Sequence, residues 1–581
     1  RPDVQAGRGG GHRRGAGVHQ PFAAPLQAGL RPGRPHHGRD GAKRRHRPLR
    51  GRQTPCRPHQ PPAVAGDADE SIGGVKARFN VWRNWLMKAI DFVAETTKKY
   101  VEQMPKSQRK KYGQFFTSKQ TAAFMAGMFE IPENKKQVSV LDPGTGSGML
   151  TAAIVDRLNE IPNIETVELV CYENNLDIIQ LLHSNLEWMK EHSSKKIVYE
   201  IKQENYILNQ SDNYNETFSA ELNPKFYDFI IANPPYMKLL KNAPEAMSMQ
   251  DVCYGAPNLY FLFAAMSAFN LKENGEMVYI VPRSWTSGAY FNKFRGKFLD
   301  EMALEQIHLF ESRDKVFEIE SVLQETMIFR AKKTLNRPEK ILVTTTRDNS
   351  DFENRTEYSA PYSTVIHGAD HYVYLVTSAQ ETAVLQKMNR WGNTLPEIGL
   401  KMKTGLTVDF RNRESLRDTE EEGAIPLFYS QHIQGGKVIF PIGKEHEYLN
   451  TNQAGLMQKN TNYLFVKRFT AKEEHRRLQC GVYLSRKNPK YSKISTQNKL
   501  NFICGVGELS ECTVYGLYVL FNSTIYDVYY RILNGSTQVN STEVNAMPVP
   551  SIEIIESMGK KLLQAQDMSE NVCNKILENY L

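Results

Sequence analysis

The sequence lacks any long uninterrupted run of apolar residues. The longest, over residues 259–271, is shorter than the roughly 20 residues that cross a membrane, and no charged-then-apolar signal segment stands at the start. Seven cysteines are scattered over 581 residues and form no Cys-x-x-Cys pair. This spacing argues against a disulfide-rich secreted scaffold and a structural zinc site. We therefore expect an intracellular protein in a reducing setting, with no membrane partner and no metal centre.

Residues 1–70 lack Ile, Ser, Asn, Tyr, Trp and Met altogether. They hold fourteen Lys or Arg and five Asp or Glu, so this tail carries the whole net charge of +9 and the rest of the chain is neutral. Such a composition cannot build a core, and it predicts disorder. The tail is either a basic arm that touches phosphates or a foreign or wrongly framed extension. The abrupt change in composition favours a non-native extension.

The rest of the chain exceeds what one core usually holds, so we expect two further domains, over residues 71–335 and 336–581. In the first, apolar runs alternate with helical patterns, which predicts a parallel sheet covered by helices on both faces. The expected strands are 138–142, 168–173, 196–201, 228–232, 276–281, 307–310 and 325–330. The expected helices are 82–101, 120–128, 149–158, 176–190 and 258–271, the last stopping at Asn274-Gly275, and a final helix spans 553–580.

The most informative stretch runs from Asp228 to Tyr236. Its apolar, β-branched residues predict a buried strand, and Pro234 and Pro235 end that strand because neither can donate to a sheet ladder. At the carboxyl end of a strand, where open α/β folds bind ligands, the loop presents the Asn233 amide, the Pro234 carbonyl and the Tyr236 ring. Two acceptors beside an aromatic ring suit an amino group on a flat heterocycle. The alternative is an ordinary strand-ending turn.

A glycine-rich turn follows the first expected strand. Gly144, Gly146 and Gly148 open a helix, and glycine lets backbone approach a ligand without a Cβ in the way. The preceding Asp142 would repel a phosphate and suits a cationic or amino-bearing ligand. The turn therefore predicts a nucleotide-like cofactor other than a dinucleotide, as against a purely structural turn.

Polar side chains also follow the next two strands. Glu173 lies 25 residues after Gly148, about where a carboxylate holds ribose hydroxyls in doubly wound folds. Asn205 follows the third strand and could reach a cofactor's base. Before the sheet, residues 112–117 form an aromatic cluster around a glycine that, taken alone, fits a packed turn equally well.

In their order along the chain, the Tyr-Gly-Gln-Phe-Phe-Thr stretch at 112–117, the glycine turn at 142–148 and Asn-Pro-Pro-Tyr at 233–236 resemble the gamma class of amino-group DNA methyltransferases, the TaqI-like group. The resemblance covers about residues 105–333 best. It implies an α/β, doubly wound Rossmann-like sheet with a C-terminal α+β target-recognition domain. It also implies S-adenosyl-L-methionine as cofactor, flanked by Tyr112, Phe115 and Thr117. Its amino-acid part would contact Asp142, Gly144, Gly146 and Gly148. Glu173 would bind its ribose and Asn205 its adenine, although the family usually has Asp at the position of Asn205.

The resemblance further implies a reaction: methyl transfer to N6 of an adenine flipped out of double-stranded DNA, which protects the site from a cognate restriction endonuclease. Asn233 and Pro234 would localise the lone pair of the amino nitrogen, while Tyr236 and, by family position, Phe317 would stack on the base. The length and layout are similar to the PstI and BsuBI type of modification enzymes, whose target is CTGCAG. A bacterial, cytoplasmic, nucleoid-associated monomer is expected, with no physical contact to the nuclease required.

Rival interpretations remain open. Asn-Pro-Pro-Tyr also occurs in enzymes that methylate a glutamine amide of release factors, and related tetrapeptides occur in ribosomal-RNA methyltransferases. Those enzymes are generally smaller and lack the leading aromatic motif. An N4-cytosine target is chemically similar, although its motif more often begins with Ser. A DNA-binding scaffold without activity is the non-enzymatic alternative, and the intact glycines speak against it.

Residues 336–581 contain no catalytic motif. Basic segments at 401–405, 466–469 and 486–491 fit either solvated faces or contacts with DNA phosphates and grooves. Residues 535–550 resemble the end of the target-recognition domains of the same enzymes.

Overall fold

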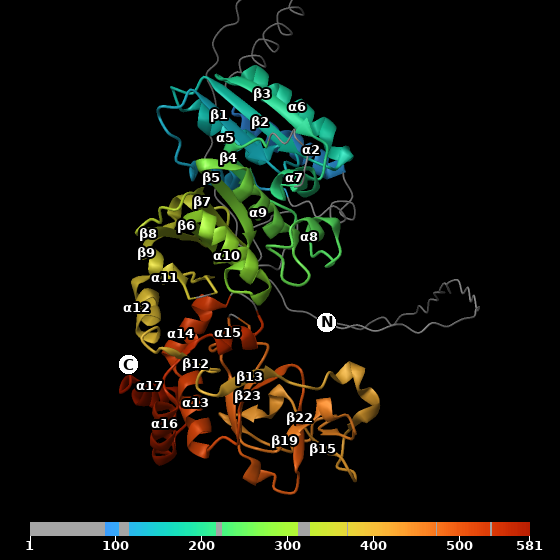
Figure 1. The fold of residues 1–581 in the computed structure, drawn as a ribbon, viewed down its shortest axis with the longest axis vertical. Coiled ribbons are helices and arrows are strands. Elements are labelled where there is room, and N and C mark those ends of the chain that lie inside the picture. Colours follow the sequence, from blue (N-terminus) through green and yellow to red (C-terminus); the bar gives the residue numbers. More distant parts are fainter. Residues whose placement is uncertain are drawn as a thin grey trace, which may run out of the picture. The chain divides into compact units, whose positions relative to one another are not determined.

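The computed structural model describes residues 87–581 except 104–115, 217–223, 312–325, 369, 472 and 535–536. The chain divides into residues 1–71 and residues 72–581, and every described residue belongs to the second unit. Within the described ranges, no helix has the length and apolar character needed to cross a membrane. Figure 1 shows the arrangement of the elements.

A nine-stranded sheet in the order β3-β2-β1-β4-β5-β7-β6-β8-β9 dominates the first half. From β3 to β5 the neighbours pair in parallel, and β7 runs antiparallel between β5 and β6. The strands are β1 (Gln137–Asp142), β2 (Thr166–Tyr172), β3 (Lys196–Lys202), β4 (Tyr227–Ala232), β5 (Leu271–Pro282), β6 (Met302–Phe310), β7 (Thr326–Lys333), β8 (Lys340–Thr346) and β9 (Thr356–Pro361). The predicted doubly wound α/β sheet is confirmed.

Helices cover both faces of this sheet because its central strands are apolar on both sides. On β4, Phe229 and Ile231 pack into one core with α2, α4, α5 and α6, whereas Ile230 and Ala232 pack into another with α7, α9 and α10. The helices are α2 (Ala89–Gln103), α4 (Lys119–Gly127), α5 (Met149–Asn159), α6 (Leu176–His192), α7 (Tyr206–Tyr214), α8 (Pro244–Ser248), α9 (Leu259–Asn270) and α10 (Asn292–Glu301), with short 3-10 turns η1 (Arg283–Thr286) and η2 (Ala289–Phe291).

The predicted end of the helix over 258–271 is confirmed to within one residue, but its predicted stop signal at Asn274-Gly275 is wrong, and so is the single helix expected over 553–580. Helix α9 ends at Asn270 and β5 begins at the next residue, so Asn274 and Gly275 lie inside the strand. Asn274 has a φ of 62° there, and the pairing with β4 is irregular between Tyr227 and Phe229, so the turn residues mark a bulge in the sheet. The single helix expected over 553–580 is two helices, because Gln566 adopts a left-handed conformation that ends the first.

The C-terminal half combines small sheets and helices, which confirms its α+β character. One sheet has the order β13-β23-β20-β21-β17-β16 and another β14-β18-β15-β22-β19. The strands are β10 (Ile366–His367), β11 (Tyr372–Val373), β12 (Asn393–Thr394), β13 (Leu400–Thr404), β14 (Leu416–Arg417), β15 (Ile425–Phe428), β16 (Ile433–Gln434), β17 (Lys437–Val438), β18 (Tyr448–Leu449), β19 (Gln458–Lys459), β20 (Tyr463–Lys467), β21 (Cys480–Tyr483), β22 (Lys493–Thr496), β23 (Leu500–Gly505) and β24 (Pro548–Val549). The helices are α11 (Tyr362–Val365), α12 (Ala379–Met388), α13 (Glu511–Phe521), α14 (Thr524–Leu533), α15 (Ser541–Asn545), α16 (Ile552–Ala565) and α17 (Glu570–Glu578), with short 3-10 turns between them.

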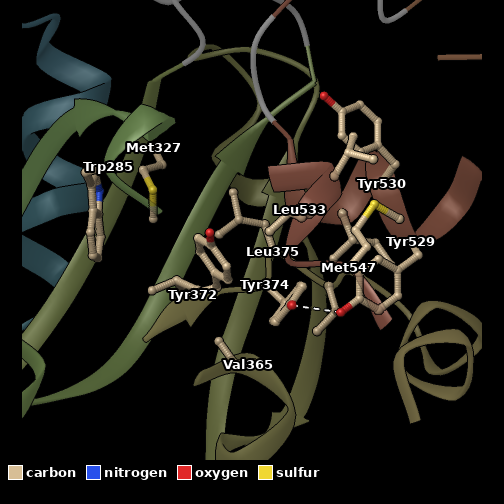
Figure 2. Close-up of a cluster of buried hydrophobic side chains, with 14 of the residues drawn as sticks. Trp285, Met327, Val365, Tyr372, Tyr374, Leu375, Tyr529, Tyr530, Leu533 and Met547 are labelled. Atoms are coloured by element: carbon tan, nitrogen blue, oxygen red, sulfur yellow. Dashed lines mark hydrogen bonds between the residues drawn. The ribbon is translucent and has the colours of Figure 1, made fainter. Parts of the chain in front are cut away.

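Buried side chains join the large sheet to the C-terminal half. Trp285 and Met327 belong to the same buried cluster as Tyr374 and Tyr529 (Figure 2). The hydroxyls of Tyr374 and Tyr529 lie 2.8 Å apart. The sheet also continues through β8 and β9, beyond residue 335. The division of this unit into domains at residues 335 and 336 stays a prediction.

Candidate active site

The carboxyl ends of β1, β2, β3 and β4 open onto one pocket. Parallel strands end at the same edge of a sheet, so residues far apart in sequence meet there. The residues that line it are Phe116, Thr117, Pro143, Gly144, Thr145, Gly146, Ser147, Met149, Leu150, Tyr172, Glu173, Asn174, Asn175, Glu204, Asn205, Tyr206, Asn233, Pro234, Pro235, Leu259 and Phe263. The predicted cofactor loop and the predicted catalytic loop therefore share a cavity.

The glycine turn after β1 has two different roles. Gly144 and Gly146 form part of the pocket wall, and Gly146 has a φ of 58°, which favours glycine. Gly148, with a φ of 88°, faces α6 instead: a Cβ there would lie 3.2 Å from Leu182 Cδ1. Gly148 thus allows the start of α5 to pack closely against α6, while Gly144 and Gly146 leave space in the pocket.

Asp142 lies beneath the turn. Its side chain is 1% exposed, and its Oδ2 accepts a hydrogen bond of 2.8 Å from the Thr151 hydroxyl. Oδ1 is buried and accepts no hydrogen bond from the described residues. Burial raises the pKa of Asp142 to about 7. Its predicted contact with the amino-acid part of the cofactor stays a prediction.

Glu173 and Asn205 both reach the pocket wall. The Glu173 carboxylate accepts backbone hydrogen bonds from Gly146 (2.9 Å) and Asn175 (2.8 Å), and burial raises its pKa. Asn205 caps α7, because its Oδ1 accepts from the Leu208 amide at 3.2 Å. Its Nδ2 donates to Glu245 Oε1 at 2.9 Å. Both predicted cofactor residues therefore have fixed orientations.

The Asn233 amide lies between two hydroxyl groups. Its Nδ2 donates to Thr117 Oγ1 at 3.1 Å, and its Oδ1 accepts from the Tyr236 hydroxyl at 2.9 Å. The same hydroxyl lies 2.9 Å from the Ile280 carbonyl oxygen. Burial raises the pKa of Tyr236 well above its usual value, so this hydroxyl keeps its proton and acts as a donor. The Tyr236 ring packs edge-to-face on Tyr260, at 6.1 Å between centroids.

Tyr112, Phe115 and Phe317 lie outside the described residues, so their predicted roles stay predictions. The sequence reasoning missed the apolar wall formed by Leu259 and Phe263. The sequence does contain a signal for this wall. Asn258 marks the start of α9, and Leu259 and Phe263 lie four residues apart at that start, which places them on one face of the helix.

An acidic cluster outside the pocket is already paired with basic side chains. Carboxylate oxygens of Glu130, Glu276 and Glu305 lie within 4.8 Å of one another. Arg330 lies 2.6 Å from Glu130 and 3.1 Å from Glu305, and Lys332 lies 3.6 Å from Glu276. We therefore assign this cluster to the structure of the sheet and not to a metal.

The basic segments of the C-terminal half differ in what surrounds them. Lys401 is exposed on β13, and Arg468 lies over the exposed ring of Phe469. In the third segment, Arg486 pairs with Glu511 at 2.5 Å and Lys490 with Glu420 at 2.5 Å. Those pairs neutralise part of the third segment, which favours a structural role for it.

A strand-end pocket with a glycine turn, a carboxylate after β2 and an Asn-Pro-Pro-Tyr loop after β4 defines a Rossmann-type methyltransferase. Residues 155–317 match the Eco57I restriction-modification methylase family. The chain is 32% identical over 468 residues to the type II methyltransferase M.PstI of Providencia stuartii, covering 78% of this chain and 90% of that protein. It is 33% identical over 463 residues to M.BsuBI of Bacillus subtilis, with the same coverage. The chain belongs to this family of type II DNA methyltransferases of restriction-modification systems.

Solved structures resemble the chain more distantly. The cryoEM structure of a DrdV-DNA complex aligns with a TM-score of 0.48 and 11% identity, over 82% of this chain and 60% of that one. The family assignment therefore rests on the sequence relatives.

Proposed function

We propose that the chain transfers a methyl group from S-adenosyl-L-methionine to N6 of an adenine flipped out of double-stranded DNA. The observation that supports this most is the position of Asn233 and Pro234 on the wall of the pocket that also holds the glycine turn and Glu173. The residues that we propose for the amino group and those that we propose for the cofactor line the same cavity.

The residues present fit this cofactor. Nothing lies within 4 Å of the place that a Cβ on Gly146 would take, so the turn leaves room on the pocket side. The Glu173 carboxylate can accept hydrogen bonds from a ribose diol, and Leu259 and Phe263 offer apolar surface for a purine. When bound, the cofactor supplies an electron-poor methyl group.

The residues of the chain then act on the target base. Asn233 Oδ1 and the Pro234 carbonyl accept hydrogen bonds from the exocyclic NH2 group, which draws its nitrogen toward a tetrahedral shape and localises the lone pair. In this proposal the Tyr236 ring covers one face of the base, and the resemblance to known methyltransferases assigns the other face to Phe317. No strong general base is needed, because attachment of the methyl group makes the nitrogen cationic and its acidic proton then passes to water.

The product base tests the proposal. The protein is incubated with methyl-labelled cofactor and a duplex containing CTGCAG, and the DNA is digested to nucleosides. We expect label in N6-methyladenine, none in a matched duplex with CTGCTG, and resistance of the treated duplex to an endonuclease that cuts CTGCAG. Label in N4-methylcytosine would support the cytosine alternative. In a parallel incubation that contains a release factor as well as the duplex, label in a glutamine of the release factor, with none in the DNA, would overturn the proposal.

Asn233→Ala separates catalysis from cofactor binding. Because the amide contributes an acceptor to the amino group and not to the cofactor, we expect transfer to fall at least about a hundredfold, the scale seen when an aligned catalytic contact is lost. The affinity for S-adenosyl-L-methionine, measured by calorimetry, stays within about threefold, which is under 1 kcal/mol. Asn163→Ala, at an exposed asparagine, is the control. Loss of both methyl transfer and cofactor binding would point to misfolding, and the variant would then give no support for a catalytic role of Asn233.

A further inference from the structure

We propose that Thr117 is a positioning residue for the catalytic amide: it turns Asn233 so that Oδ1 faces the target base. The resemblance to known methyltransferases implied a cofactor contact for Thr117 instead. This inference rests on the function proposed above and assigns a residue 116 positions away in the sequence to the same chemical step.

The geometry of the amide carries the inference. Thr117 Oγ1 accepts a hydrogen bond of 3.1 Å from Asn233 Nδ2. The two ends of a planar amide point in different directions, so a partner for Nδ2 sets the direction of Oδ1. On that side the Tyr236 hydroxyl donates to Oδ1 at 2.9 Å, as the amino group of a target base would. A reversed amide would present an NH2 group to the NH2 group of adenine, and two donors repel each other.

Thr117 is suited to hold this position. Its side chain is 7% exposed, and it precedes Ser118, whose hydroxyl caps α4 by accepting from the Thr121 amide. The start of α4 therefore fixes the backbone at residue 117. A β-branched side chain also has few χ1 choices, so the hydroxyl stays in place.

Tyr236 lets the base enter without the loss of a hydrogen bond. Its hydroxyl lies equally far, 2.9 Å, from Asn233 Oδ1 and from the Ile280 carbonyl oxygen. When the amino group donates to Oδ1, the hydroxyl proton can turn fully to Ile280. The amide thus has a partner on each side both before and after the base arrives.

The test compares Thr117→Val, which keeps the shape and removes the hydroxyl, with Thr117→Ser, which keeps the hydroxyl. We expect the valine variant to lower the single-turnover rate of adenine methylation about tenfold to a hundredfold, as misaligned groups do, while its affinity for S-adenosyl-L-methionine changes less than about threefold. The serine variant restores the rate to within about threefold of wild type. Thr382→Val, which removes a buried hydroxyl 2.7 Å from that of Tyr358, is the matched control and should keep the wild-type rate.

A second arm separates orientation from general damage. In an Asn233→Asp background the two carboxylate oxygens are equivalent, so Thr117→Val should have little further effect on the residual rate. The proposal would be overturned if Thr117→Val alone left the methylation rate unchanged. It would also be overturned if this variant kept the wild-type rate but bound S-adenosyl-L-methionine at least about tenfold more weakly. Failure of the proposed function would look different, since wild-type protein itself would then leave adenine unmethylated.

Discussion

Asp142 combines almost complete burial with one carboxylate oxygen that accepts no hydrogen bond within the described residues. Burial raises its pKa from 3.8 to about 7; the Thr151 hydroxyl opposes the shift and Glu173 adds to it. The folded state therefore binds this proton more tightly than the unfolded chain does. The stabilisation that protonated Asp142 gives is complete below about pH 4 and is lost as the pH rises through about 7.

Asp142→Asn should remove this pH dependence, because an amide oxygen can still accept from Thr151 but does not ionise. We expect the thermal midpoint of the variant, relative to that of wild type, to rise as the pH is raised from 5 to 8. Scanning calorimetry of both proteins measures these midpoints. Glu353→Gln, on an exposed 3-10 turn, controls for the loss of a surface charge. Parallel curves for Asp142→Asn and wild type would show that Asp142 is ionised at both ends of the range.

At the scale of single elements, helices α13 and α16 cross with backbone against backbone. A Cβ on Gly559 would collide with the Cys512 carbonyl, and one on Gly516 with the Ile555 carbonyl. We expect Gly559→Ala to destabilise the fold by about 1–3 kcal/mol or more, since overpacked helices must separate. Gly296, inside α10, has no atom within 4 Å of its Cβ position, so Gly296→Ala should instead stabilise by about 0.5–1 kcal/mol. Chemical denaturation of both variants measures the two effects, and equal shifts would contradict the close crossing.

Sequence patterns predicted the elements of the first half better than their ends. Apolar runs such as that of β4 found the parallel strands, and because such strands end at one edge, the meeting of Glu173 with Asn233 followed. The contact between Thr117 and Asn233 did not follow, because no local pattern encodes a hydrogen bond between segments 116 residues apart. Asn274-Gly275 misled the prediction, since the same turn residues stop helices and form bulges.

At the scale of the described unit, the C-terminal half contacts the segment that follows β5. Ser287 donates to the buried carboxylate of Glu543 on α15 at 3.1 Å. A few residues earlier, Ser284 lies 3.1 Å from the hydroxyl of Tyr260, and Tyr260 packs on Tyr236. These contacts, joined by the short turn from Ser284 to Ser287, connect the C-terminal half to the loop of residues 233–236, so we expect the two halves to unfold together.

Tyr529→Phe tests that cooperation. The Tyr529 hydroxyl lies 2.8 Å from that of Tyr374 in the buried cluster of Figure 2. It also donates to Asn389 Oδ1 at 3.2 Å. Its removal leaves the buried Tyr374 hydroxyl and the partly buried Asn389 side chain each short of a partner, which costs about 1–3 kcal/mol. Calorimetry should show one transition for residues 72–581, moved to lower temperature, whereas Tyr580→Phe, which removes a half-buried hydroxyl bonded to Ser557, moves it little. Two separate transitions, of which only that of the C-terminal half responds to Tyr529→Phe, would contradict this prediction. The two halves would then fold independently, and their common core would be an interface between separately stable domains.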